Sequence, residues 1–134
     1  MDETGPTRRE GFLDAKAIAA FLEDPGSLDI APILALADER YGLPTVRTLS
    51  LGPGDGAAVL LPDAAIAGFL LDLDPPDWRS EWGGLLLFQR QSERVEGFRP
   101  VPGALTLFSA NLRPLISLIT PQGRRRTSIF GWWA

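Results

Sequence analysis

The sequence of 134 residues contains no histidine and no cysteine. Without cysteine the chain has no disulfide, no thiolate nucleophile and no cysteine-ligated metal. Without histidine it lacks the commonest general base near neutral pH and the commonest ligand of transition metals. These absences exclude Ser-His-Asp catalysis and histidine-ligated zinc or iron. Carboxylates, hydroxyls, the single lysine (Lys16) and arginines remain for chemistry.

Long hydrophobic runs and an excess of basic charge are also missing. The apolar runs are too short to span a membrane, and no apolar stretch follows the acidic start at residues 1–3, so we expect no secretory signal. The 13 basic and 17 acidic residues give a net charge of −4, which argues against a basic nucleic-acid groove. We therefore expect a cytoplasmic protein that binds neither nucleic acid nor a membrane. The preference for arginine over lysine is typical of a GC-rich bacterial genome.

The composition, 45% hydrophobic and 22% charged, is that of one globular domain. Residues 1–13 are polar and predict a flexible lead-in to a single domain over residues 14–134. A helix is predicted over about Ala15–Glu23, with Asp14 as its N-cap and an apolar face of Ala15, Ile18, Ala19 and Leu22 at helical spacing. A second helix is predicted over about Ile30–Tyr41, capped by Asp29 and ended at Gly42.

After the predicted helices, short apolar segments alternate with turn residues. This pattern is typical of strands in a sandwich or barrel. Strands are predicted over residues 46–51, 57–61, 66–73, 85–88, 104–110, 115–120 and 127–133. The sequence thus predicts a mainly β, α+β domain with its helices at the N-terminal end.

Three local features allow a functional interpretation and a plain structural one. The GPGDG run at 52–56 has the glycines of a phosphate-binding loop, but a strand is predicted to follow it, which favours a turn. Arg124-Arg125-Arg126 is a basic cluster or a solvated turn. The acidic series Asp55, Asp63, Asp72, Asp74 and Asp77 offers ligands for a hard cation, although its spacing matches no EF-hand loop.

Two of the four tryptophans, Trp132 and Trp133, are adjacent on a predicted strand. Neighbouring side chains on a strand point to opposite faces, so at least one of the two is expected to face away from the core. Both are candidates for an interface with a partner.

Three segments in the second half of the chain form a family pattern. They are PDWRSEWGGLLLF at 76–88, GFRP with PGALTLF at 97–108, and RTSIFGW at 126–132. Together they resemble the prolyl-hydroxylase-like branch of the 2-oxoglutarate/Fe(II)-dependent oxygenases, well over about residues 66–134 and weakly over 14–65. The resemblance implies a double-stranded β-helix, a cupin-like jelly roll with helices on one side. Because members of the resembling family are usually longer at the front, we expect that part of the usual sheet is missing there or that a second copy completes it.

The resemblance also implies an iron site of two histidines and one carboxylate, from which this sequence departs. The His-x-Asp pair belongs within residues 54–63, where only Asp63 is a weak candidate for the carboxylate. The second histidine position falls on Pro114, because Ile116-Ser117 matches the residues that follow that histidine. Fe(II) is therefore disfavoured, and no cofactor is expected unless 2-oxoglutarate itself binds.

Arg126 matches the arginine that holds the far carboxylate of 2-oxoglutarate in this family. Ser128 lies two residues further on and so shares its strand face. A guanidinium can bind a carboxylate through two N–H groups, which makes Arg126 and Ser128 candidates for a 2-oxoglutarate-like ligand. The alternative is that Arg126 pairs with an aspartate or glutamate inside the barrel.

These observations leave three functional hypotheses. The first is a non-catalytic relative of the oxygenases, a pseudoenzyme kept for binding or assembly as a homodimer or as a subunit of a related oxygenase. The second is a small-carboxylate binding module that uses Arg126 without a metal. The third is an atypical dioxygenase whose metal is held by carboxylates such as Asp55 and Asp63.

Overall fold

The computed structural model describes residues 5–24, 31–35, 42–58, 61–90 and 93–134. Two α-helices, α1 (Ala15–Glu23) and α2 (Ala31–Leu34), precede most of the strands. The described strands are β1 (Thr7–Arg9), β2 (Thr45–Leu51), β3 (Ala57–Ala58), β4 (Ala67–Asp74), β5 (Leu86–Gln89), β6 (Val95–Phe98), β7 (Leu105–Ser109), β8 (Leu115–Ile116) and β9 (Arg126–Trp133). Neither described helix has the length and apolar character needed to cross a bilayer.

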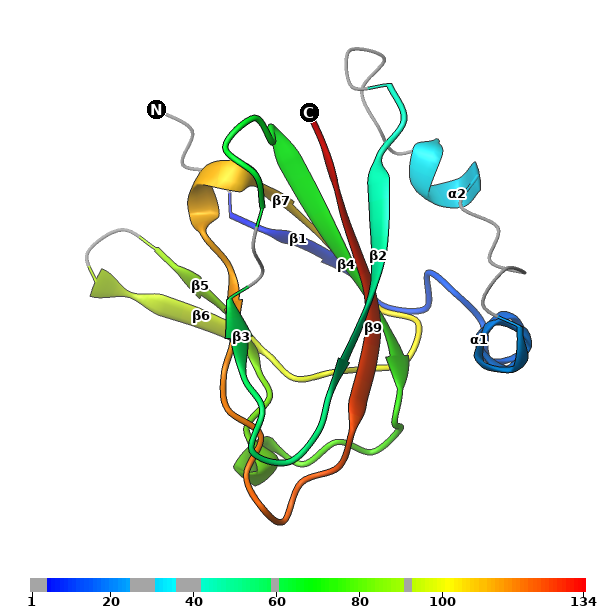
Figure 1. Ribbon diagram of the computed structural model, residues 1–134, viewed down its shortest axis with the longest axis vertical. Helices are drawn as coiled ribbons and strands as arrows, with labels where there is room; N and C mark the ends of the chain where they lie inside the picture. Colours follow the sequence, from blue (N-terminus) through cyan, green and yellow to red (C-terminus); the bar gives the residue numbers. More distant parts are fainter. Residues whose placement is uncertain (1–4, 25–30, 36–41, 59–60, 91–92) are drawn as a thin grey trace.

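The strands form two antiparallel sheets that face each other (Figure 1). The large sheet has the order β1-β7-β4-β9-β2, and the small sheet has the order β3-β8-β5-β6. Strands that are consecutive in the chain repeatedly lie in different sheets, as in a jelly roll. The predicted double-stranded β-helix is therefore confirmed, and both sheets form within this one chain.

One hydrophobic cluster fills the space between the two sheets. Leu70 and Phe108 contribute from the large sheet, while Leu86, Phe88 and Ile116 contribute from the small sheet. These five side chains are at most 4% exposed. Because side chains alternate along a strand, this inner cluster fixes which residues of each strand face the interior of the barrel.

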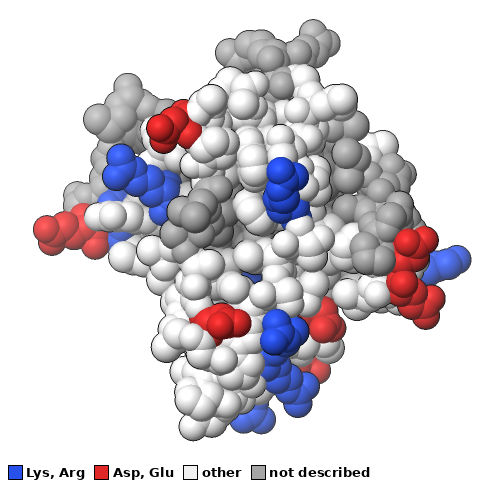
Figure 2. Space-filling view, in the orientation of Figure 1, with Lys and Arg blue, Asp and Glu red and all other residues white. Residues whose placement is uncertain are grey.

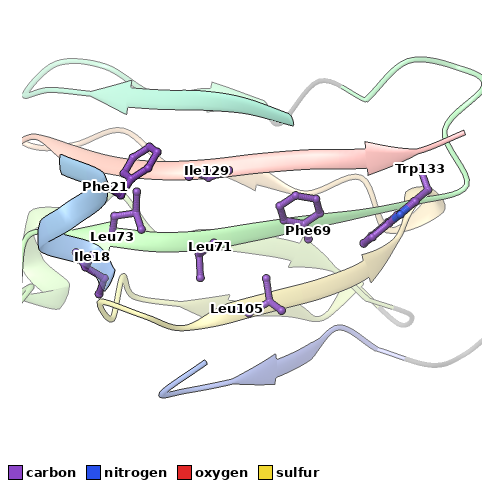
Figure 3. Packing of buried hydrophobic residues seen from close by; sticks show 8 residues of the cluster. All are labelled: Ile18, Phe21, Phe69, Leu71, Leu73, Leu105, Ile129 and Trp133. Carbon is purple, nitrogen blue, oxygen red and sulfur yellow. The ribbon is translucent and has the colours of Figure 1, made fainter. Parts of the chain in front are cut away.

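A second cluster lies on the outer face of the large sheet, and α1 packs on one end of it. Figure 3 shows Ile18 and Phe21 of the helix beside Leu73 near the end of β4, with Leu71 further along the same strand. Leu105, Ile129 and Trp133 extend the cluster over β7 and β9. The helix thus covers one end of the apolar outer face of the large sheet and leaves the inner face to the barrel (Figure 3).

The predicted first helix is confirmed with the same bounds. The Asp14 side chain accepts a hydrogen bond from the Ala17 N–H at 2.8 Å, the usual N-cap contact. The buried positions are Ile18 and Phe21, whereas Leu22, which the periodicity assigned to the apolar face, is 45% exposed. The apolar face predicted from the spacing therefore differs from the face of α1 that is buried.

Other predictions need correction near the N-terminus and in the middle of the chain. The lead-in over residues 1–13 is not wholly irregular, because Thr7–Arg9 forms strand β1 and pairs with β7. The second helix is described only over Ala31–Leu34, and its predicted cap Asp29 and its last turns lie outside the described residues. Strand β6, which the sequence does not predict, has Glu96 and Gly97 between its two apolar residues and so lacks the apolar alternation that marks a strand.

Candidate functional site

The alternation of β9 places Arg126 and Ser128 inside the barrel. Arg126 is 1% exposed and Ser128 is fully buried, while Thr127 between them is half-buried. On the neighbouring strand β4, Asp72 is paired in register with Ser128 and is also 1% exposed. The two central strands of the large sheet therefore bring an arginine, a serine and an aspartate together at one level of the interior.

Arg126 is occupied by partners from the protein itself. Its Nη2 donates to Asp72 Oδ1 at 2.7 Å, and its Nη1 donates to the backbone carbonyl of Gly84. Its Nε lies 3.4 Å from Ser128 Oγ. The alternative prediction, that Arg126 pairs with an acidic residue inside the barrel, describes this structure, and the acidic residue is Asp72.

The paired glycines of the EWGG segment shape the wall against which Arg126 lies. Gly84 has a φ of +65°, a region that L side chains rarely adopt. A Cβ there would also lie 2.8 Å from Trp78 Cζ2 and 3.0 Å from Ile119 Cγ1. Glycine therefore permits the turn that presents its carbonyl oxygen to the guanidinium of Arg126.

The Asp72 carboxylate receives donors on both oxygens. Oδ1 accepts from Arg126 and from Ser128 Oγ at 3.2 Å. Oδ2 lies 3.4 Å from Arg8 Nη2 and 3.4 Å from the Val101 N–H. We call Asp72 and these four donor residues the Asp72 cluster.

Arg8 reaches the Asp72 cluster from the edge strand β1. Its Nη1 donates to Thr106 Oγ1 at 2.9 Å and its Nη2 donates to the Arg99 carbonyl at 2.7 Å. Its guanidinium also lies 5.1 Å from the centroid of the Phe98 ring. The side chain is 12% exposed, so Arg8 closes the cluster on the side nearer to solvent.

The charges in the Asp72 cluster do not cancel. Two guanidinium groups share one carboxylate, and arginine does not lose its proton in proteins. One positive charge is therefore in excess, although neutral acceptors on Thr106 and Arg99 bind Arg8. Such a group is stable only while the carboxylate stays in place, because burying an uncompensated charge is costly.

The positions implied for iron ligands do not form a metal site. Asp63 is exposed in a turn, and Pro114 is buried but has no side-chain donor. Leu61 and Leu112, which flank these positions, pack against the inner hydrophobic cluster. Among the described residues no group of three or more acidic side chains could hold a metal ion. These residues therefore do not fit an Fe(II) ion.

The remaining sequence candidates are dispersed. Arg124 and Arg125 are exposed whereas Arg126 is buried, so the basic run is divided by the start of β9. Figure 2 shows basic side chains gathered at the lower end of this view, with acidic groups also present on the same face. The GPGDG segment is a turn between β2 and β3, closed by the Asp55 carboxylate on the Gly52 N–H at 2.9 Å. No helix follows it to offer an anion site.

The two adjacent tryptophans lie on opposite faces of β9, as predicted. Trp133 is 2% exposed and its ring centroid lies 5.4 Å from that of Phe69 in the outer cluster. The prediction of Trp133 as an interface residue is therefore wrong, because its side chain is buried in the outer cluster. Trp132 is half-buried, with the Arg47 guanidinium 5.7 Å from its ring centroid.

The site residues that sequence reasoning missed are Asp72, as the partner of Arg126, and Arg8. In the sequence, Asp72 is only one member of a loose acidic series. A usable signal was nevertheless present, because Asp72 interrupts the apolar run GFLLDL at 68–73. A charge within a strand that is buried on both faces requires a partner of opposite charge.

Two facing antiparallel sheets, with a helix on the outer face of the larger one, define the double-stranded β-helix class. The chain has the version of this fold found in prolyl-hydroxylase-like 2-oxoglutarate oxygenases. A Pseudomonas putida prolyl-4-hydroxylase has a TM-score of 0.79 and 21% identity, with 96% of this chain and 87% of that chain covered.

Two further structures support the same fold. A viral collagen prolyl hydroxylase from Paramecium Bursaria Chlorella virus-1 has a TM-score of 0.67 and 11% identity, over 97% of this chain and 95% of that chain. A 2OG-Fe(II) oxygenase family protein from Burkholderia pseudomallei has a TM-score of 0.68 and 14% identity, over 97% and 84%. No family model and no curated protein match the sequence. At these identities the likeness shows the fold alone.

Proposed function

We propose that this chain is a non-catalytic domain with an oxygenase fold, which acts by binding or assembly. The observation that carries the proposal is the ion pair between Arg126 and Asp72, at 2.7 Å with both side chains at most 2% exposed. In the resembling oxygenases the matching arginine binds the co-substrate. Here a carboxylate of the chain itself takes that arginine.

The positions of the expected iron ligands support the same proposal. Two of the three ligands would be histidines, and the chain has none. The carboxylate candidate Asp63 is exposed, and Pro114 stands at the second histidine position. The site therefore lacks imidazole ligands for iron. It also lacks a free arginine for the co-substrate, because Arg126 is already paired with Asp72.

The test is co-substrate turnover by the purified chain. The protein is incubated with Fe(II), ascorbate and 2-oxoglutarate, and succinate is measured by mass spectrometry against a protein-free control. The proposal predicts no succinate above that control. Succinate formation that requires both the protein and Fe(II) would contradict it and would favour the atypical dioxygenase.

The small-carboxylate binding module remains a second candidate, favoured by the shared burial of Arg126 and Ser128 at the inner face of β9. Calorimetric titration of 2-oxoglutarate into the metal-free chain separates the two. Under the main proposal no heat of binding is observed, because Asp72 holds the arginine. Binding that is abolished by Arg126→Met would establish the second candidate instead.

Trp132 is the residue that we propose for contact with a second copy or with a related oxygenase subunit. It is half-buried beside the half-buried Phe130, at a ring-centroid distance of 5.8 Å. Sedimentation velocity of the native chain and of Trp132→Ala tests self-association. A dimer that Trp132→Ala dissociates supports the assignment, whereas a dimer that persists unchanged removes Trp132 from the interface.

A further inference from the structure

The Asp72 carboxylate is surrounded by the donors that a bound carboxylate ligand would need. Arg126 and Ser128 donate to one oxygen, and Arg8 and the Val101 N–H lie beside the other. Two of these donors carry full positive charge, and charge-assisted hydrogen bonds are the strong ones. Both carboxylate oxygens thus have a charged and a neutral donor.

The donors of the Asp72 cluster do not depend on the strand that supplies the carboxylate. Arg8 comes from β1, Arg126 and Ser128 come from β9, and Val101 comes from the segment between β6 and β7. Only the link from the carboxylate to the backbone belongs to β4. A carboxylate without that link would meet the same four donors.

The backbone at Asp72 is held independently of its side chain. The Asp72 N–H donates to the Ala104 carbonyl at 3.0 Å, and the Asp72 carbonyl accepts from the Gly103 N–H at 2.8 Å. A shorter side chain at this position therefore removes the carboxylate and leaves the local strand geometry with its hydrogen bonds. The result would be a vacant, positively charged space at a buried position.

We propose that the Asp72 cluster is a carboxylate-binding site whose resident ligand is the chain's own Asp72, so that the protein blocks its own site. Removing that side chain opens the site to a free small monocarboxylate such as formate. This inference rests on the proposed function, in which Arg126 is closed to outside ligands. The inference adds that Asp72 closes the site because its carboxylate takes the position that a free carboxylate would occupy. Arg8 supplies the second charged donor at that position.

The experiment compares Asp72→Gly, Asp72→Ala and Asp72→Asn. The glycine variant lacks the Cβ as well as the carboxylate. A free formate needs this additional space, because it is not bonded to the chain and must stay at a non-bonded distance from it. The alanine variant offers less room. The asparagine variant loses the same charge but keeps the space filled, so it is the matched control.

The measured quantity is the urea midpoint of each variant as sodium formate is added at constant ionic strength, with chloride as the balancing anion. Where a variant is partly unfolded without urea, trimethylamine N-oxide is added until half of the protein is folded. The folded fraction is then followed as formate is added. A ligand that binds only the folded state raises the ratio of folded to unfolded protein about elevenfold at ten times its Kd. We expect that response in Asp72→Gly, a smaller one in Asp72→Ala, and none in Asp72→Asn or the native chain.

The contribution of Arg8 is tested in the glycine background. Adding Arg8→Met to Asp72→Gly should weaken the formate response, because one of the two charged donors is lost. A formate response equal in Asp72→Gly and Asp72→Asn, or absent from both, would overturn the proposal. That failure is separate from failure of the proposed function, which would appear as iron-dependent succinate production by the native chain.

Discussion

Breaking the buried pair of Arg126 and Asp72 should destabilise the protein far more than breaking a partly exposed pair of similar length. The test changes are Asp72→Asn and Arg126→Met, alone and together. The control is Arg90→Met in a partly exposed pair, because Arg90 Nη1 lies 2.8 Å from Glu96 Oε2 but the two side chains are 27% and 43% exposed. Burial, not distance, then separates the test pair from the control pair.

The expected costs follow from what each change leaves behind. Asp72→Asn leaves two arginines without a counter-charge, and removing one partner of a buried pair costs about 3–5 kcal/mol. Arg126→Met should cost less, because Arg8 Nη2 remains 3.4 Å from Asp72 Oδ2. Arg90→Met, in the partly exposed pair, should cost about 1 kcal/mol or less. A domain of this size has a total stability of about 5–15 kcal/mol, so the first change removes a large share of it.

The assay is urea unfolding followed by tryptophan fluorescence, with the slope of each transition checked for two-state behaviour. The double variant should lose less than the sum of the single variants, by about 1–3 kcal/mol, because both changes remove the same interaction. Additive costs, or a cost for Asp72→Asn no larger than that for Arg90→Met, would refute the ion-pair reasoning.

Three further changes test the fold. Asp14→Ala should destabilise α1 by about 1 kcal/mol, whereas Asp14→Asn should retain most of the cap, as measured by thermal unfolding. Gly68→Ala should cost about 1–3 kcal/mol in urea unfolding, because the new Cβ would lie 2.7 Å from Phe108 Cε2; an unchanged midpoint would show that the ring moves freely. Phe88→Ala should cost about 3–5 kcal/mol, since Phe88 is fully buried between the sheets; a loss under 1 kcal/mol would contradict that packing.

The sequence predicts the fold well where local signals are strong. Helix α1 has its predicted bounds because Asp14 caps it and Asp24-Pro25-Gly26 follows it. The long strands β2, β4 and β9 agree to within one residue, because their apolar character continues through them. Strands β1 and β6 are short edge strands without an apolar alternation, and only pairing with β7 and β5 makes them strands. Such pairing is a tertiary effect that local composition does not contain.

The candidate site is predictable in part. Arg126 and Ser128 follow from the family pattern and from the two-residue spacing, and their burial agrees with an inward-facing position. The identity of the internal partner does not follow, because it requires the register between β4 and β9. That register places Asp72 opposite Ser128 and shifts between Asp72 and Asp74. The contact of Arg8 with Asp72 is harder still to predict, because the two residues are 64 positions apart in the sequence.

The central claim is that this oxygenase-fold chain holds no catalytic metal. Electron paramagnetic resonance of Mn(II), used as a redox-stable substitute for Fe(II), tests it directly. Mn(II) is titrated into the native chain with and without 2-oxoglutarate, and the signal of the free ion is quantified. The account predicts that the free-ion signal equals that of the protein-free titration in both series. Loss of one equivalent of free Mn(II) per chain, with or without 2-oxoglutarate, would contradict it.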